Sequence, residues 1–255
     1  MAKINQHLLN NKIESLIAQK DAGNELYSYA DLDLIKRYEG SGGQGNKGAS
    51  GQGILYEFFT PDFVVDLMWD LAKHHGYKSG NILEPGIGTG RMIAPASDYS
   101  KCVGFETNPI SARICELSYK GCTVYNKHFE TAFLAPDRYT TKLKGKTTWL
   151  KEYPFSLVIG NPPYGVYNNE YSSYFPHARK FKQIELFFIY QSLLLLKAGG
   201  LLVFVTGSNF LRNGDTYKQA KTEIGKLADL IDAYRLPPVF MSSQVPTDII
   251  VLRKK

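Results

Sequence analysis

Residues 81–90 read NILEPGIGTG, an apolar strand that ends in an acid and runs directly into a turn with three glycines. Glycines in such a turn let the main chain approach a ligand at the carboxyl edge of a sheet. The next predicted strand ends at Glu106, roughly twenty residues later, where an acid accepts hydrogen bonds from both hydroxyls of a ribose. The alternative for Glu106 is a surface acid beside the helix that begins at Asn108-Pro109. The paired features favour a nucleotide site.

Strands and helices alternate on both sides of this stretch. Periodicity predicts strands at 81–84, 101–106, 122–126, 155–160, 199–207, 230–234 and 248–252, and helices at 109–119, 184–197 and 217–227. Alternation of this kind predicts an α/β fold with a mostly parallel, twisted sheet and helices on both faces.

A further helix is predicted to open at Thr60-Pro61-Asp62. A hydroxyl N-cap, a proline in the first turn and an acid near the positive end of the helix dipole favour this start. The expected apolar face then carries Phe63, Val64, Leu67, Met68 and Leu71.

The N-terminal part of the chain differs in composition from the rest. Residues 1–39 show two partial helical stripes, the first with Ile4, Leu8, Ile13, Leu16 and Ile17 and the second with Leu32, Ile35 and Tyr38. Gly40 is expected to stop the second helix, and half of the residues in 40–53 are glycine, which suits a linker or a mobile flap. We therefore expect a helical extension with a linker at 1–53 and a catalytic domain at 54–255. Residues 136–152 carry four lysines and read as an inserted loop, either solvated surface or a contact for DNA.

Composition excludes several classes of protein. The chain has 255 residues, 44% of them hydrophobic and 21% charged, so it is not a disordered sequence. Three cysteines without paired spacing argue against a disulfide framework and against a zinc site, so no metal is expected. We expect no signal peptide, no membrane span and a cytoplasmic location. The net charge of +6 is compatible with an anionic partner.

Residues 161–164 read NPPY and follow the predicted strand 155–160. Prolines stiffen the loop and restrict the residue before them. Such a loop presents a carboxamide, a main-chain carbonyl and an aromatic ring at the same sheet edge as the glycine turn. The Asn161 amide oxygen and the Pro162 carbonyl would accept the two N–H bonds of a planar amine, while Tyr164 stacks on its ring. The alternative is a proline-stiffened turn capped by asparagine.

Together these motifs resemble the S-adenosylmethionine-dependent N6-adenine DNA methyltransferases in the gamma motif order, from Ile54 to the end of the chain. The resemblance implies a Rossmann-like methyltransferase fold and S-adenosyl-L-methionine as cofactor. FFTPD at 58–62 is similar to the segment that holds the methionine part of the cofactor. The implied cofactor residues are Phe59, Thr60, Pro61, Glu84, Pro85, Gly86, Gly88, Gly90, Glu106, Thr107, His128, Phe129 and Asn161, and the implied catalytic residues are Asn161, Pro162, Pro163 and Tyr164.

One segment departs from the family pattern. The family often has an acid before an aromatic residue after the third strand, whereas this chain reads Lys127-His128-Phe129-Glu130. Phe129 is therefore expected to pack on the cofactor adenine without the usual polar contact. The tail, with Tyr234–Pro237 and residues 245–255, loosely resembles the methylase portions of helicase-type restriction or phage proteins.

The resemblance implies methyl transfer to the N6 amine of a flipped-out adenine. Aromatic and basic residues alternate in 165–182, which suits stacking on the base and contact with phosphates, the alternative being a packed loop. The usual target-recognition domain is missing after the predicted core, so we expect a recognition, helicase or nuclease partner. Three other readings remain open: an RNA methyltransferase, a protein-glutamine methyltransferase, and a non-catalytic S-adenosylmethionine-binding subunit.

Overall fold

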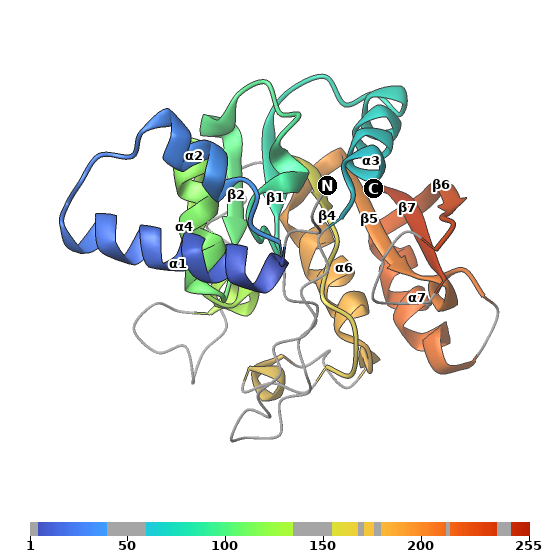
Figure 1. Ribbon diagram of the computed structural model, residues 1–255. Helices are drawn as coiled ribbons and strands as arrows, with labels where there is room; N and C mark the ends of the chain where they lie inside the picture. The colour runs from blue at the N-terminus through green and yellow to red at the C-terminus, as the bar shows by residue number, and fades with distance from the viewer. Residues whose placement is uncertain are drawn as a thin grey trace.

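The computed structural model describes residues 5–39, 60–134, 155–167, 171–175, 180–212, 215–238 and 246–255. Within these ranges seven strands form one sheet in the order β3-β2-β1-β4-β5-β7-β6 (Figure 1). The strands are β1 (Asn81–Glu84), β2 (Cys102–Phe105), β3 (Thr123–Tyr125), β4 (Phe155–Gly160), β5 (Leu196–Gly207), β6 (Ala228–Arg235) and β7 (Thr247–Lys254). The helices are α1 (Gln6–Ala22), α2 (Tyr29–Ile35), α3 (Asp62–His74), α4 (Pro109–Ser118), α6 (Ile184–Leu195) and α7 (Asp215–Leu227).

Strand pairing is parallel from β3 through β5 and antiparallel for the last two strands. The chain runs from β1 to β2 and β3 on one side of the sheet, and then from β4 to β5 on the other. The prediction of a mostly parallel α/β sheet is confirmed. In such sheets ligands bind at the carboxyl edge where the strand order reverses, and here that point lies between β1 and β4.

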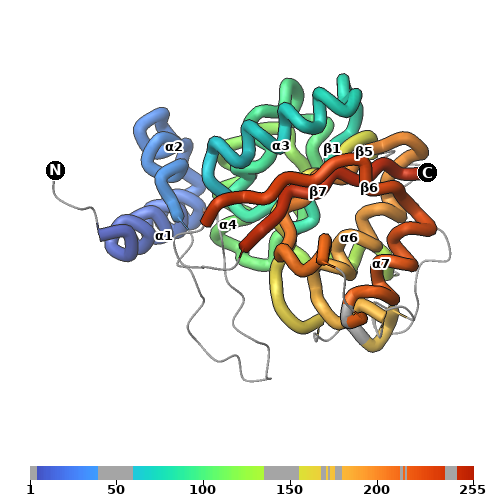
Figure 2. The backbone as a smooth tube through the Cα atoms, turned by 90° about the vertical axis from the view of Figure 1, so that its right-hand side faces the viewer, coloured from blue at the N-terminus to red at the C-terminus, as the bar shows by residue number. Residues whose placement is uncertain are grey.

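Helices cover both faces of the sheet, as Figure 2 shows with α3 on one side and α6 and α7 on the other. One core cluster joins α6 and α7 to the sheet, and a second joins α3, the loop after β1 and part of α4 to the opposite face. All six residues of β4 are buried, because this strand is central and has apolar layers on both sides. Because apolar layers occupy both faces of the sheet, a polar site is expected at the ends of its strands.

The start of α3 differs from its prediction in two respects. Pro61, not Thr60, is the N-cap residue, and no side chain caps this helix. Phe63 was expected on the buried face but is 59% exposed. The buried stripe is centred on Val65, Met68 and Ala72, and Phe63 in the first turn falls outside that arc.

The boundary between α6 and β5 also differs from its prediction. The helix was expected to run to Lys197 and the strand to begin at Gly199, but α6 ends at Leu195 and β5 begins at Leu196. The periodicity of this apolar run suits either a helix or a strand. Leu196 pairs with Phe155 of β4, so the end of the run belongs to the strand.

The N-terminal helices dock onto α4 through a small core of their own. Its buried members are Ile13, Ile17, Ile35, Tyr38 and Ile114. Two hydrogen bonds join the Arg113 guanidinium to the Asp21 carboxylate, with Nε–Oδ2 at 2.9 Å and Nη2–Oδ1 at 2.7 Å.

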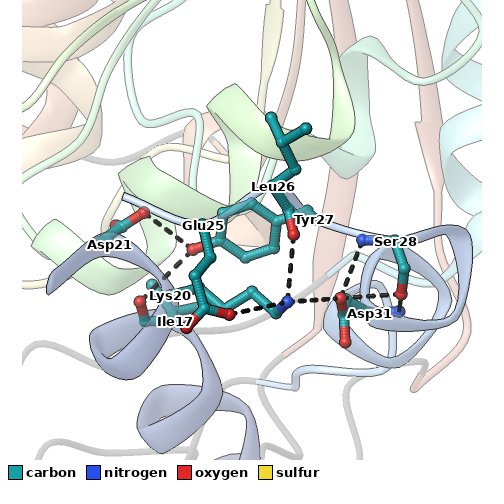
Figure 3. Close-up of polar contacts among 8 residues, drawn as sticks. All are labelled: Ile17, Lys20, Asp21, Glu25, Leu26, Tyr27, Ser28 and Asp31. Carbon is teal, nitrogen blue, oxygen red and sulfur yellow. Dashed lines mark hydrogen bonds and ion pairs between the residues drawn. The ribbon is translucent and has the colours of Figure 1, made fainter. Parts of the chain in front are cut away.

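The turn between α1 and α2 is held by polar contacts (Figure 3). Lys20 lies between Glu25 and Asp31 with Nζ–O distances of 3.4 Å to each, and the Tyr27 hydroxyl donates to Asp21. Leu8 was expected in the first stripe, but it is 64% exposed because it lies on the solvent side of α1.

Several expectations fall outside the described residues, namely those for Ile4, for Gly40 and the glycine-rich segment to residue 53, and for the lysine-bearing segment 136–152. In the part of the chain that the structure describes, no helix combines the length and apolarity needed to cross a membrane.

Replacing a residue of the N-terminal core should loosen α1 and α2 from the sheet domain. Ile13→Ala empties a fully buried position and should cost about 2–4 kcal/mol, measured as lost amide hydrogen-exchange protection in both helices. Leu8→Ala on the exposed side of the same helix is the control and should change protection little. Equal effects of the two variants would contradict the docking described above.

Candidate active site

The glycine motif and the NPPY motif meet at one edge of the sheet because β1 and β4 are parallel neighbours. Leu83 of β1 is paired with Val158 of β4, so the two strands end within one residue of each other. A Cβ atom built on Gly86 would lie 4.0 Å from Pro163 Cδ, and a Cβ on Gly160 would lie 3.5 Å from Glu84 Cγ. Two motifs more than seventy positions apart therefore form one surface, as predicted from the strand pattern.

Different structural constraints favour glycine at different positions of the first motif. Gly88 and Gly90 adopt positive φ angles of 52° and 85°, which disfavour other residues. A Cβ on Gly90 would also come within 2.6 Å of the Tyr119 ring and 2.7 Å of Cys115 Sγ. Around Gly86, by contrast, Pro163 is the only described neighbour within 4 Å of such an atom. Gly90 thus allows packing on α4, whereas Gly86 leaves space at the sheet edge.

Glu84 ends β1 as a buried carboxyl group with 4% exposure. Its Oε2 atom has no hydrogen-bond partner among the described residues. Burial raises the pKa of Glu84 well above its usual 4.5, and the nearby Cys122 and Glu106 groups raise it further. A buried carboxyl with an unused oxygen suits a positively charged ligand, because pairing would offset the cost of ionising it.

Glu106 joins the glycine turn to the start of α4. Its Oε2 accepts the Gly88 N–H at 2.9 Å, and its Oε1 accepts the Asn108 N–H at 2.7 Å. Thr107 beside it is exposed. The carboxylate therefore shapes the turn. Each of its oxygens can accept more than one hydrogen bond, and its contact with a ribose stays a prediction.

Asn161 lies between two hydroxyl groups at the end of β4. The Tyr164 hydroxyl donates to its Oδ1 at 2.7 Å, and its Nδ2 donates to Thr60 Oγ1 at 3.3 Å. Burial raises the pKa of Tyr164, so its hydroxyl stays protonated and able to donate. Pro162 is buried, and Pro163 is half-buried. The stacking role predicted for Tyr164 stays a prediction, to which the structure adds a hydrogen bond from its hydroxyl.

The residues after β3 lie further into the core than the sequence suggested. Phe129 is 2% exposed and packs against the rings of Phe105, Phe133 and Phe188. His128 is half-buried, with its ring 5.1 Å from that of Tyr171. Contact of these two residues with a cofactor stays a prediction. Phe59 lies outside the described residues, and Pro61 is the N-cap of α3.

The expectation that the aromatic rings of residues 165–182 stack on a base is wrong for most of the rings that the structure describes. Tyr167, Phe175 and Phe181 are buried in the core cluster under α6, while Tyr171 and Tyr174 pack against that cluster. The Tyr167 ring stacks on Phe187 at 4.1 Å. Lys180 pairs with Glu223 of α7 at 3.0 Å. His177 and Arg179 lie outside the described residues. Burying an aromatic ring in the core stabilises the fold, whereas a ring left exposed to stack on a base loses that stabilisation.

Sequence reasoning missed two buried acids near the NPPY loop. Glu185, in the first turn of α6, is 6% exposed, has an Oε2 atom without a described partner, and has a pKa raised by burial to about 7. Glu130 is 1% exposed and accepts the Tyr167 hydroxyl at 3.1 Å. The signal for Glu185 was available, because it is an acid within the otherwise apolar run IELFFIY at 184–190.

A model of the Eco57I restriction-modification methylase family matches residues 101–240, which include the NPPY motif and more than half of the chain. Defense against restriction protein B of Escherichia phage P1 is 24% identical over 224 residues, covering 87% of this chain and 9% of that protein. Modification methylase CviBIII of Paramecium bursaria Chlorella virus NC1A is 30% identical over 163 residues, covering 62% of this chain and 38% of that protein. The chain thus spans a minor part of these relatives.

Among solved structures, the fold is similar to that of a putative class I S-adenosylmethionine-dependent methyltransferase from Listeria monocytogenes. The TM-score is 0.57 at 18% identity, with 76% of this chain and 58% of that chain covered. At this identity the likeness concerns the fold alone.

The two glycines of the first motif should separate stability from ligand binding. Gly90→Ala forces a left-handed residue against Tyr119 and Cys115 and should cost about 1–3 kcal/mol in a denaturant titration. Gly86→Ala should leave the unfolding midpoint nearly unchanged, yet weaken S-adenosylmethionine binding at least about tenfold in calorimetry. Normal affinity in the Gly86 variant would show that the ligand lies elsewhere.

Proposed function

Because the chain belongs to the Eco57I restriction-modification methylase family, we propose that it transfers a methyl group from S-adenosylmethionine to the N6 amine of an adenine flipped out of DNA. The observation that carries the proposal is the parallel pairing of β1 with β4. It brings Glu84 and the glycine turn, to which Glu106 is hydrogen-bonded, to the same sheet edge as the loop that carries Asn161.

S-adenosylmethionine is the cofactor that the family and the class I fold imply. The unpartnered buried oxygen of Glu84 and the open space at Gly86 fit a cationic cofactor that approaches the main chain closely. Glu84, Gly86, Gly88 and Glu106 would hold it, with Glu106 accepting hydrogen bonds from the ribose. When bound, it supplies an electrophilic methyl group on a positively charged sulfur.

The role of the protein in this reaction is to activate a weakly nucleophilic amine. The lone pair of an adenine amine is delocalised into the ring. Hydrogen bonds from the amine to the Asn161 Oδ1 and to the Pro162 carbonyl favour the pyramidal nitrogen that forms during transfer, which stabilises the transition state. The ring of Tyr164 offers a stacking face for the extruded base. Alignment of amine and methyl supplies much of the remaining acceleration.

We further propose that sequence recognition comes from a partner or from additional polypeptide. The supporting observation is that the chain spans 9% and 38% of two relatives in the restriction-modification field. Methyl transfer should be assayed with tritiated S-adenosylmethionine against DNA, RNA and protein in parallel. Labelling of DNA at adenine N6 supports the proposal, labelling of RNA or of a glutamine would replace it, and cofactor binding without labelling would favour a non-catalytic subunit.

Removing the Asn161 carboxamide should abolish turnover and spare cofactor affinity. Asn161→Ala loses a transition-state hydrogen bond, which is worth about 3 kcal/mol or more, so the rate should fall at least about a hundredfold. Calorimetry should give a dissociation constant for S-adenosylmethionine close to that of the wild type. Near-normal turnover in this variant would refute the mechanism.

Affinity for S-adenosylmethionine should rise with pH through the titration of Glu84. The carboxyl is neutral below its raised pKa, so binding a cation there requires release of a proton, and the affinity grows until the group is ionised beforehand. The window runs from about pH 5 to 7.5, below which carboxyls titrate generally and above which the cofactor amine loses its charge. Glu84→Gln should abolish the dependence. A pH-independent affinity in the wild type would mean that Glu84 does not face the cofactor.

A further inference from the structure

The carboxamide of Asn161 has two nearly equivalent orientations, related by a half-turn that exchanges oxygen and nitrogen. Only one of them can accept a hydrogen bond from an amine at a given position, because the other presents N–H donors to N–H donors. The catalytic motif by itself does not select between the two. A selecting contact must come from outside the side chain.

Two hydroxyl groups flank this carboxamide, one on each side. Tyr164 Oη lies 2.7 Å from Oδ1, and Thr60 Oγ1 lies 3.3 Å from Nδ2. A phenol is a better donor and a poorer acceptor than an alcohol, so the tyrosine favours the oxygen on its side. An aliphatic hydroxyl accepts well, so the threonine suits the nitrogen on the other side. Both contacts favour the same orientation of the carboxamide. In this orientation Oδ1 keeps a second lone pair that can accept another hydrogen bond.

Thr60 reaches Asn161 from a segment 101 positions away in the chain. It directly precedes the N-cap residue of α3 and is 6% exposed, so its contact with Asn161 places the start of α3 beside the end of β4. Thr60 does not cap α3, since Pro61 occupies the N-cap position without a side-chain hydrogen bond. Among the described residues, the buried hydroxyl therefore has a hydrogen-bond partner in the NPPY motif and none in the helix that follows it.

We propose that Thr60 is a positioning residue for Asn161, which, together with the Tyr164 hydroxyl, holds the carboxamide in the orientation that accepts the target amine. This rests on the proposed function of Asn161. It differs from the role that family resemblance implies for the Thr60-Pro61 segment, which is to hold the methionine part of the cofactor. The two roles predict opposite kinetic effects.

Thr60→Val keeps the shape of the side chain and removes its hydroxyl. We expect turnover at saturating cofactor to fall about tenfold, the equivalent of one hydrogen bond, while the dissociation constant of S-adenosylmethionine stays within about twofold. Thr60→Ser restores an acceptor and should restore most of the turnover. A matched control is Thr206→Val, which removes another buried hydroxyl, on β5, and should leave turnover unchanged.

A measurement independent of catalysis is the side-chain amide signal of Asn161 in ¹H–¹⁵N spectra, identified by its absence in Asn161→Asp. The signal should move in Thr60→Val and return toward its original position in Thr60→Ser. If the wild type labels no nucleic acid, the proposed function fails, but the spectra still report whether Thr60 holds Asn161. An unchanged Asn161 signal in Thr60→Val, or a variant with weakened cofactor binding and normal saturated turnover, would overturn the positioning role.

Discussion

The parallel pairing of β1 with β4 is the constraint on which the remainder of the site depends. Neighbouring parallel strands point their carboxyl ends to the same edge, and the chain leaves this pair in opposite directions. The glycine turn and the NPPY loop therefore become neighbours without any contact of their own having to bring them together. Helices on both faces keep the strands buried.

Hydrogen bonds between distant segments then give this edge its shape. Glu106 holds the glycine turn through Gly88, and Thr60 links the start of α3 to Asn161. Such contacts fix groups in advance, which matters because a misplaced acceptor loses much of its catalytic value. Glu84 and Glu185 are exceptions, since each has a buried Oε2 atom without a partner among the described residues. An unpaired buried carboxyl costs stability, which is typical of a group kept for a ligand.

The aromatic rings of residues 165–182, which were expected to contact a substrate, pack in or against the hydrophobic core. Tyr167 and Phe175 follow the NPPY motif, yet they pack under α6, and the Tyr167 hydroxyl donates a hydrogen bond to the buried Glu130. Composition counts aromatic and basic residues but does not say which way they point. The N-terminal helices make a related point. Their helical pattern is weak, yet they dock onto α4 through five buried residues, one of which, Tyr38, follows α2, and through an exposed guanidinium–carboxylate pair.

The sequence by itself determined the α/β class, the order of the strands along the chain and the two loops for which we propose the chemistry. An apolar run that ends at glycine or proline predicts where a buried strand ends, and this prediction needs only the residues of that segment. Tertiary structure alone decided that Thr60 bonds Asn161 rather than capping α3, that Phe63 is exposed, and that Phe129 lies within the core. These outcomes depend on which elements face one another. Periodicity along one segment carries no information about the partner of a hydroxyl 101 positions away or about the ring that fills a gap between helix and sheet.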